Sequence, residues 1–269
     1  MDLLDIFRFS YSWISDNRSW KWYGALLAIV LVMVTLIAVF FPLPTGATDS
    51  QDFAKKFESL SSSAAISAVL GVFVVSLIGS LAIMYVSANI AINALDSKKI
   101  PAQPFDFNRY LSYIWLHVLN AIYIFFSLYN TRFLLIPAAA LVLFLLSIAM
   151  QFLILAGMVV FGAYMVVVVY NAIRLSVAVP IFLSRKLART SDALAESWKI
   201  TEGRVIEVLV TNILTNIIWG IIMLIPGLIP IVNFIISPIS NFYGEYIRVG
   251  IYDALGGGAG EEKVRKKKK

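Results

Sequence analysis

WYGALLAIVLVMVTLIAVFF, residues 22–41, is an apolar stretch that contains no charged side chain. A helix of this length rises about 30 Å, which matches the hydrocarbon core of a bilayer. Lys21 precedes the stretch and Pro42 follows it, so a charge limits its start and a helix-breaking residue its end. The stretch predicts a membrane-spanning helix and decides the fold class of the chain.

The composition of the whole chain agrees with this prediction. Of the 269 residues, 60% are hydrophobic and 14% are charged, whereas soluble domains average about 45–50% and about 25%. The chain has no cysteine and one histidine, which excludes disulfide scaffolds, thiolate catalysis and cysteine-ligated metals. Because only helices satisfy all backbone groups within one segment in lipid, we expect an all-α, polytopic helix bundle.

Further charge-free runs lie at 59–95, 110–131, 133–173 and 208–244. They predict spans within 64–95, at 110–129, within 133–182, at 205–224 and at 231–255. The turn IPGLIP, residues 225–230, separates the last two spans as a tight hairpin. Residues 131–150 are left with two interpretations, a short re-entrant helix or an extension of the neighbouring spans.

Positive charges predict the topology. They gather in four segments, namely Arg8, Arg18 and Lys21; Lys98, Lys99 and Arg109; Arg185, Lys186, Arg189, Lys199 and Arg204; and the C-terminal tail. Short loops rich in Lys and Arg stay in the cytoplasm. An even number of crossings must then separate each segment from the next. We therefore predict six spans in the plasma membrane, with both termini in the cytoplasm.

Three parts of the chain differ in character. Residues 1–21 predict an interfacial helix, with Leu3, Ile6, Phe7 and Ile14 near one face. Residues 22–255 form one transmembrane domain, and residues 256–269 form a flexible basic tail. The basic side chains of the tail are Lys263, Arg265, Lys266, Lys267, Lys268 and Lys269. We expect them to bind anionic head groups; ribosomal RNA is the alternative ligand, and no DNA partner is expected.

Motifs of catalysis are missing from the sequence. Neither a Gly-x-Ser-x-Gly elbow nor a nucleotide-binding Walker loop occurs. The single histidine, His117, lies within a predicted span near Asn120, and we expect it to hydrogen-bond across a helix interface. The sequence therefore predicts a protein that is not an enzyme and holds no cofactor.

Polar residues within the predicted spans form a candidate polar groove, because such residues are costly in lipid and face the bundle interior. The candidates are Arg174, Asn171, Asn212, Asn216, Asn241, Glu245 and Arg248. One interpretation is a hydrated groove that opens to the cytoplasm, with Arg174 as its charge. The other is interhelical hydrogen bonding, with Arg174 reaching the inner head groups.

Three stretches in the C-terminal half carry a resemblance. They are RLSVAVP at 174–180, ALAESWKITEG at 193–203 and IYD at 251–253. This pattern resembles the membrane domain of glycerophosphoryl diester phosphodiesterase-like proteins and related uncharacterised inner-membrane families. The resemblance implies a six-span module without a defined reaction, since the phosphodiesterase chemistry belongs to a separate soluble barrel. The chain has no hydrophilic segment long enough for such a barrel.

The motif residues of this resemblance are Ser197, Trp198, Thr201, Gly203, Tyr252 and Asp253. We interpret them as architecture rather than as a catalytic site. Residues 191–199 predict a surface helix anchored by Trp198. Thr201 is expected to cap the following span, and Gly203 to permit close entry into it.

These observations favour a membrane scaffold or a lipid-associated accessory module. One alternative is a transporter, channel or flippase-like carrier that uses the polar groove. The other is an insertase-like factor whose basic tail attracts ribosomes. Small residues along the second span (Ser76, Ser80, Ser87 and Ala91) allow close packing of helices. The chain is therefore expected to bind either another membrane protein or a second copy of itself.

Overall fold

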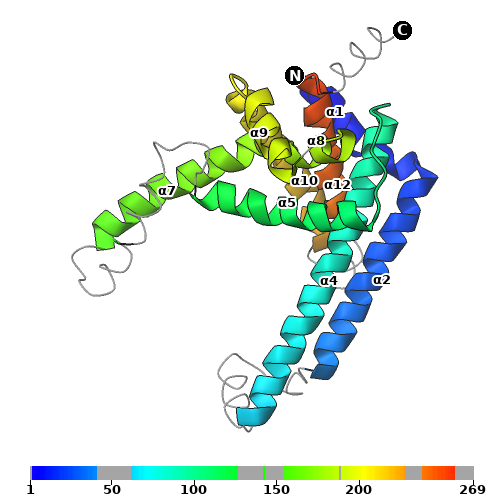
Figure 1. Ribbon diagram of the computed structural model, residues 1–269, viewed down its shortest axis with the longest axis vertical. Coiled ribbons are helices and arrows are strands. Elements are labelled where there is room, and N and C mark those ends of the chain that lie inside the picture. Colours follow the sequence, from blue (N-terminus) through cyan, green and yellow to red (C-terminus); the bar gives the residue numbers. More distant parts are fainter. Residues whose placement is uncertain are drawn as a thin grey trace.

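The computed structural model describes residues 2–40, 62–126, 142, 154–187, 189–227 and 238–257. Every regular element within these ranges is a helix (Figure 1). The predicted all-α fold class is therefore confirmed for the part of the chain that the structure describes.

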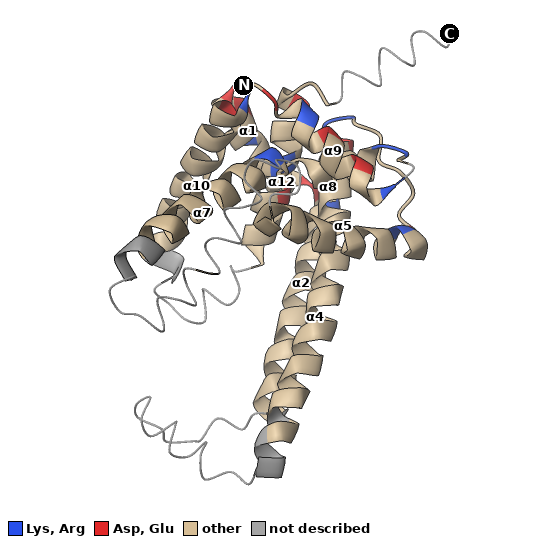
Figure 2. Cartoon of the chain, turned by 60° about the vertical axis from the view of Figure 1, so that its left-hand side comes forward, with Lys and Arg blue, Asp and Glu red and all other residues tan. Residues whose placement is uncertain are grey.

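Two long helices form a hairpin that projects from the rest of the molecule. They are α2 (Asn17–Phe40) and α4 (Ser62–Ser97). The hairpin carries no charged side chain along most of its length, as Figure 2 shows. Gly79 of α4 lets the two backbones approach, because a Cβ atom there would collide with the side chain of Met33. A close glycine contact of this kind is common where membrane helices pack.

Four helices in the described ranges are long and apolar enough to cross a membrane. They are Asn17–Val39, Val69–Ser97, Met158–Ser184 and Val205–Leu224. The third of these comprises α7 (Ile154–Arg174) and α8 (Ala178–Ser184), and the fourth lies in α10 (Val205–Gly227). These four correspond to the first, second, fourth and fifth predicted spans.

The third and sixth predicted spans are not among these four helices. Helix α5 (Phe107–Phe126) occupies the predicted third span but is not among the four candidates, and it lies across the direction of the α2–α4 hairpin (Figures 1 and 2). Helix α12 (Ile239–Ala254) covers the second half of the predicted sixth span. The uncertain segment 131–150 lies outside the described residues except for Val142.

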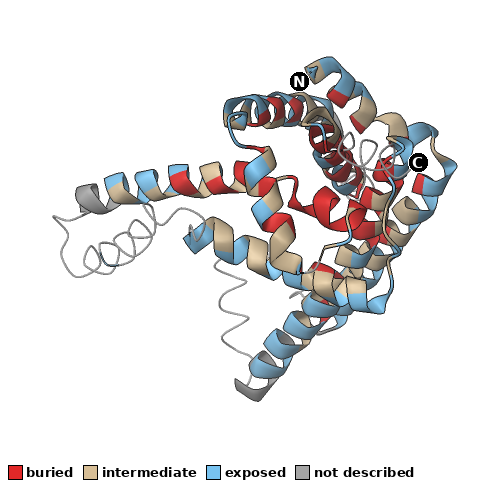
Figure 3. Ribbon diagram, turned by 45° about the horizontal axis from the view of Figure 1, so that its top comes forward, coloured by how far each residue is buried: buried red, intermediate tan, exposed pale blue. Residues whose placement is uncertain are grey.

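The core of the molecule lies around α12 and α8, which Figure 3 shows as largely buried. Helix α12 packs against the C-terminal half of α4, against α8 and against α1 (Leu3–Ser10). Gly250 of α12 contacts Ile6 and Phe9 of α1: an added Cβ atom would lie 3.3 Å from the side chain of each. The first helix of the chain therefore sits directly on the last one described.

The predicted N-terminal helix is present in two pieces, α1 and a 3₁₀ turn at Ser12–Ser15. Asp2 caps α1 by accepting a hydrogen bond from the backbone nitrogen of Leu4 at 2.9 Å. The expectation of one shared apolar face is wrong, because the 3₁₀ turn reorients the chain. Ile6 is buried against α12, whereas Ile14 is 51% exposed.

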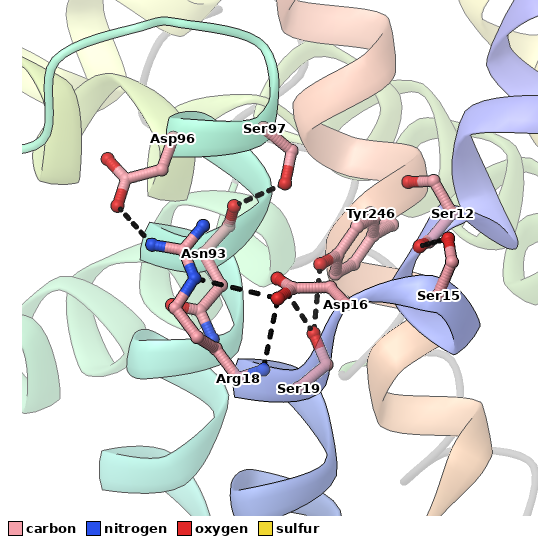
Figure 4. Close-up of polar contacts among 9 residues, drawn as sticks. All are labelled: Ser12, Ser15, Asp16, Arg18, Ser19, Asn93, Asp96, Ser97 and Tyr246. Carbon is pink, nitrogen blue, oxygen red and sulfur yellow. Dashed lines mark hydrogen bonds and ion pairs between the residues drawn. The ribbon is translucent and has the colours of Figure 1, made fainter.

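Charged side chains gather at the end of the molecule opposite the tip of the hairpin (Figure 2). Figure 4 shows how α2 and α4 meet there. The guanidinium of Arg18 lies 3.5 Å from the carboxylate of Asp16 and 3.6 Å from that of Asp96. The hydroxyl groups of Ser19 and Tyr246 lie 3.2 Å apart and join α2 to α12. We call this region the charged end.

Candidate functional site

Helix α12 is buried over most of its surface but keeps one open stripe, and that stripe is polar. Ser240, Asn241 and Arg248 are exposed and Gly244 is partly exposed, while the remaining faces are packed. A helix surface that faces lipid is expected to be apolar. This stripe is therefore suited to contact water or a polar ligand.

An ion pair lies within the stripe. The Nη1 atom of Arg248 donates a hydrogen bond of 2.8 Å to Oε1 of Glu245. Glu245 is 5% exposed, and its second carboxylate oxygen, Oε2, has no hydrogen-bond partner among the described residues. The Arg248 side chain is 44% exposed. Glu245 is thus buried with one carboxylate oxygen unpaired, whereas the Arg248 side chain is exposed.

Helix α5 carries three polar side chains on one face. Tyr113, His117 and Asn120 are spaced at i, i+4 and i+7 and lie on the same side of the helix. The rings of Tyr113 and His117 are 4.6 Å apart in a T-shaped arrangement.

Three buried atoms on this face have no hydrogen-bond partner among the described residues. They are the hydroxyl oxygen of Tyr113, Nε2 of His117 and Oδ1 of Asn120. The expected hydrogen bond of His117 across a helix interface is not formed through Nε2 within the described residues. Leaving a buried polar group unpaired costs about 1–3 kcal/mol, so a set of such groups side by side needs a reason. We call Tyr113, His117 and Asn120 the α5 cluster.

Arg174 takes no part in this cluster. Its Nη2 atom donates a 2.6 Å hydrogen bond to the carbonyl oxygen of Trp198, and its Nη1 atom donates one of 3.2 Å to the hydroxyl of Tyr170. The guanidinium lies 4.3 Å from the centre of the Trp198 ring, a favourable cation–π distance. The arginine therefore joins α7 to α9 (Thr190–Ile200).

The backbone of Arg174 is engaged by the same helix. Its carbonyl oxygen accepts hydrogen bonds from the hydroxyl of Ser197 at 2.9 Å and from that of Thr201 at 3.1 Å. Both hydroxyl-bearing residues are buried. We call Arg174, Ser197, Trp198 and Thr201 the α7–α9 knot. It brings together four residues that sequence analysis had singled out for two different reasons.

The asparagine candidates are distributed over several contacts. Asn171 donates a 2.9 Å hydrogen bond to the carbonyl of Ile124 in α5. The amides of Asn212 and Asn216 donate to carbonyls one turn earlier in α10, at 2.9 Å and 2.7 Å. Of the candidate polar groove, the structure places Asn241, Glu245 and Arg248 on one stripe of α12.

Tyr252 and Asp253 bind elements at the charged end. The Tyr252 hydroxyl lies 3.2 Å from the Ser184 hydroxyl and accepts a 3.2 Å hydrogen bond from Nε of Arg185, which also pairs with Glu196. The carboxylate of Asp253 pairs with Nζ of Lys98 at 3.1 Å. These motif residues hold α12 to the chain segments that follow α4 and α8.

Two interpretations of single motif residues are corrected. Thr201 ends α9 rather than capping α10, which begins at Val205. An added Cβ atom on Gly203 would meet nothing within 4 Å, but the residue has a φ of +75°. Glycine is therefore needed there for a left-handed backbone conformation and not for a close approach. The basic tail residues lie outside the described residues.

No family model, curated protein sequence or solved structure matches the chain. The candidate site therefore depends on its geometry alone. Sequence analysis missed the contribution of Tyr113 and interpreted His117 as structural. The spacing of three polar residues, Tyr113, His117 and Asn120, within an otherwise apolar segment was the signal that could have indicated this face.

Proposed function

We propose that the protein is a multi-pass membrane scaffold or lipid-associated accessory module whose charged end lies in the cytoplasm. The observation that carries this proposal is the α7–α9 knot. The most conspicuous charge within a predicted span, Arg174, is used to hold a surface helix in place. A side chain committed to such a contact supports a rigid architecture rather than a moving charge in a pathway.

The six-span topology belongs to the same proposal. Arg18 pairs with Asp96, and Lys98 pairs with Asp253. The first pair supports an even number of crossings between the first two basic segments, and the second pair supports an even number between Lys98 and the end of α12. The four candidate helices supply four of the crossings. The third crossing is assigned to residues 110–129, most of which lie in α5, and the sixth to residues 231–255.

Single cysteines test this topology cleanly, because the chain has none of its own. Ala195→Cys places a thiol on the exposed face of α9. Asp49→Cys places one between the first two predicted spans, in a segment that cytoplasmic termini and six spans put outside. An impermeant maleimide should label the first only from the cytoplasmic side and the second only from the outer side. Labelling of Ala195→Cys from outside would overturn the orientation.

A photo-crosslinking amino acid tests the scaffold role in native membranes. Placed at Lys199, on the exposed face of α9, it should yield one reproducible adduct with another protein. Placed at Ile213, on the exposed apolar face of α10, it should yield lipid adducts. If no position on α9 forms a protein adduct at native expression levels, the scaffold role is refuted.

A carrier is the second candidate function, and one observation favours it. The open stripe of α12 is polar, since it carries Ser240, Asn241 and Arg248. Such faces mark substrate paths in membrane proteins. Transport into proteoliposomes that is lost in Glu245→Gln but kept in Arg174→Lys would favour the carrier over the scaffold.

A further inference from the structure

An exposed apolar patch lies at the start of α2. It consists of Ile14, which is 51% exposed, and Trp20, which is 48% exposed, and we call it the Trp20 patch. We propose that this patch is a membrane anchor that lies among the glycerol and head groups of phospholipids at the charged end. The inference rests on the proposed placement of the protein in a membrane and deepens it by naming a surface that contacts the polar layer. It does not depend on which side of the membrane the charged end faces.

The 3₁₀ turn before α2 separates this patch from the buried face of α1. Ile6 of α1 is 2% exposed and packs against Gly250 of α12. Leu4 is exposed, but the side chains of Asp5 and Arg8, one and four positions later on α1, are exposed and charged. The Trp20 patch, after the turn, is therefore the better candidate for contact with lipid.

Contacts within the chain fix the Trp20 ring and leave its open surface apolar. Its Nε1 atom donates a 3.0 Å hydrogen bond to the carbonyl oxygen of Ile14, and an indole has no other polar atom. The ring lies 5.8 Å from that of the buried Trp13 and 5.6 Å from that of Tyr23, centre to centre. The exposed part of the indole is thus hydrocarbon, held beside the side chain of Ile14.

The patch continues the surface of α2 that we propose faces lipid. Trp20, Gly24, Ala28 and Leu31 follow each other at intervals of three or four residues, and all four are exposed, so they lie on one face of the helix. This face belongs to a helix that is long and apolar enough to cross a membrane. Leu31 lies about 16 Å further along the axis than Trp20, which is close to half of a hydrocarbon core of about 30 Å. The patch therefore lies at the edge of the lipid-facing surface.

The charges beside the patch favour phospholipid as its occupant. Lys21 is exposed, and 58% of the Arg18 side chain is exposed. Tryptophan is enriched at the interface between membrane and water, where neighbouring lysine and arginine side chains reach phosphate groups. A two-fold contact with a second copy would instead bring these cations close to their own counterparts. Figure 1 shows the start of α2 at the outer edge of the molecule, where lipid has access.

Spin labels on single cysteines test the proposal, because the chain has no cysteine of its own. The full chain is placed in nanodiscs of phosphatidylcholine and phosphatidylglycerol with a nitroxide at Ile14→Cys, Leu31→Cys or Ala195→Cys. Paramagnetic relaxation measures collisions with oxygen, which concentrates in hydrocarbon, and with a nickel chelate, which stays in water. The ratio of oxygen to nickel collisions should be highest at Leu31→Cys, lowest at Ala195→Cys and intermediate at Ile14→Cys.

Each other outcome has a distinct meaning. Nickel collisions at Ile14→Cys that are as frequent as at Ala195→Cys would overturn the proposal, because the patch would then lie in water. Few collisions with either reagent would indicate that a second copy covers the patch, and would overturn it as well. A low ratio at Leu31→Cys would refute the placement of α2 in the membrane, so the two failures are recognised separately.

A tryptophan variant and a matched control assign the effect to the ring. Trp20→Ala should lower the ratio at Ile14→Cys to the value at Ala195→Cys. Trp115→Ala removes a ring of α5 that is 52% exposed, and it should leave the ratio at Ile14→Cys unchanged. If Trp20→Ala fails to fold, the label at Ile14→Cys with the Trp20 ring in place decides the proposal by itself.

Discussion

The Nη2 atom of Arg109 donates a 3.0 Å hydrogen bond to the backbone carbonyl of Arg185, which is 76 positions later in the chain. The same atom also donates to the carbonyl of Phe182, whose ring lies under the guanidinium. Two basic segments on either side of a long apolar stretch thus meet at one end. This is the relationship that an even number of crossings between them requires.

Arg109→Gln should destabilise the protein, because it removes a charged donor from two carbonyls at a partly buried site. Hydrogen bonds to charged groups contribute about 1.5–3 kcal/mol each. We expect the melting temperature in detergent to fall by several degrees, measured by thermal-shift assay. Lys21→Gln, on an exposed position of α2, is the control and should leave it unchanged within about one degree.

Arg174→Leu should lower stability. The substitution leaves the carbonyl of Trp198 without its donor and removes the cation–π contact, which together suggest a loss of about 2–4 kcal/mol. Denaturant unfolding measures this loss. An unchanged free energy of unfolding would contradict the role of Arg174 in holding α9.

Ser197→Ala should cost about 1 kcal/mol, because the buried Arg174 carbonyl keeps its second donor, Thr201. The double variant Ser197→Ala with Thr201→Val should cost more than the sum of the two single changes. In that variant the carbonyl loses both side-chain partners. Strict additivity in denaturant unfolding would show that the two hydroxyl groups do not share this acceptor.

Gly203→Ala should destabilise the protein by about 1 kcal/mol, since a side chain at positive φ is strained. Gly220→Ala offers a control of opposite sign. Gly220 lies within α10, has an ordinary φ and has free space around it, and alanine is preferred to glycine in a helix interior. Equal effects of the two substitutions on unfolding would contradict the assigned role of Gly203.

Gly250→Val should displace α1 from α12, because even a single Cβ atom there meets Ile6 and Phe9 at 3.3 Å. A cysteine introduced at Ile6 reports the displacement: it should be protected from maleimide in the parent and become labelled in the valine variant. Gly24→Val is the control, since nothing lies within 4 Å of the position of its Cβ atom. Protection that persists in Gly250→Val would contradict the contact.

Sequence analysis predicted the helical class and the elements that depend on local pattern. The charge-free run 22–41 became α2, and the capped, amphipathic segment 191–199 became α9. Both follow from hydropathy and capping, which act within one segment. The side of the membrane on which α9 lies stays a prediction.

The side-chain contacts of individual residues were harder to predict, because they depend on the packing of distant segments. Arg174 and His117 were each assessed within their own helices. The structure gives Arg174 two partners on α9 and α7, and leaves His117 Nε2 without a hydrogen-bond partner among the described residues. Interhelical geometry of this kind is not encoded in the spacing of one helix. Whether α5 crosses the membrane stays a prediction.

The burial of α12 has a consequence for biosynthesis. This helix follows every other described helix in the chain, yet α1, α4 and α8 all pack against it. During translation, the faces of these earlier elements that contact α12 stay uncovered until α12 has been synthesised. Assembly of the core is thus a late event, and a chain truncated before residue 239 would leave those faces uncovered.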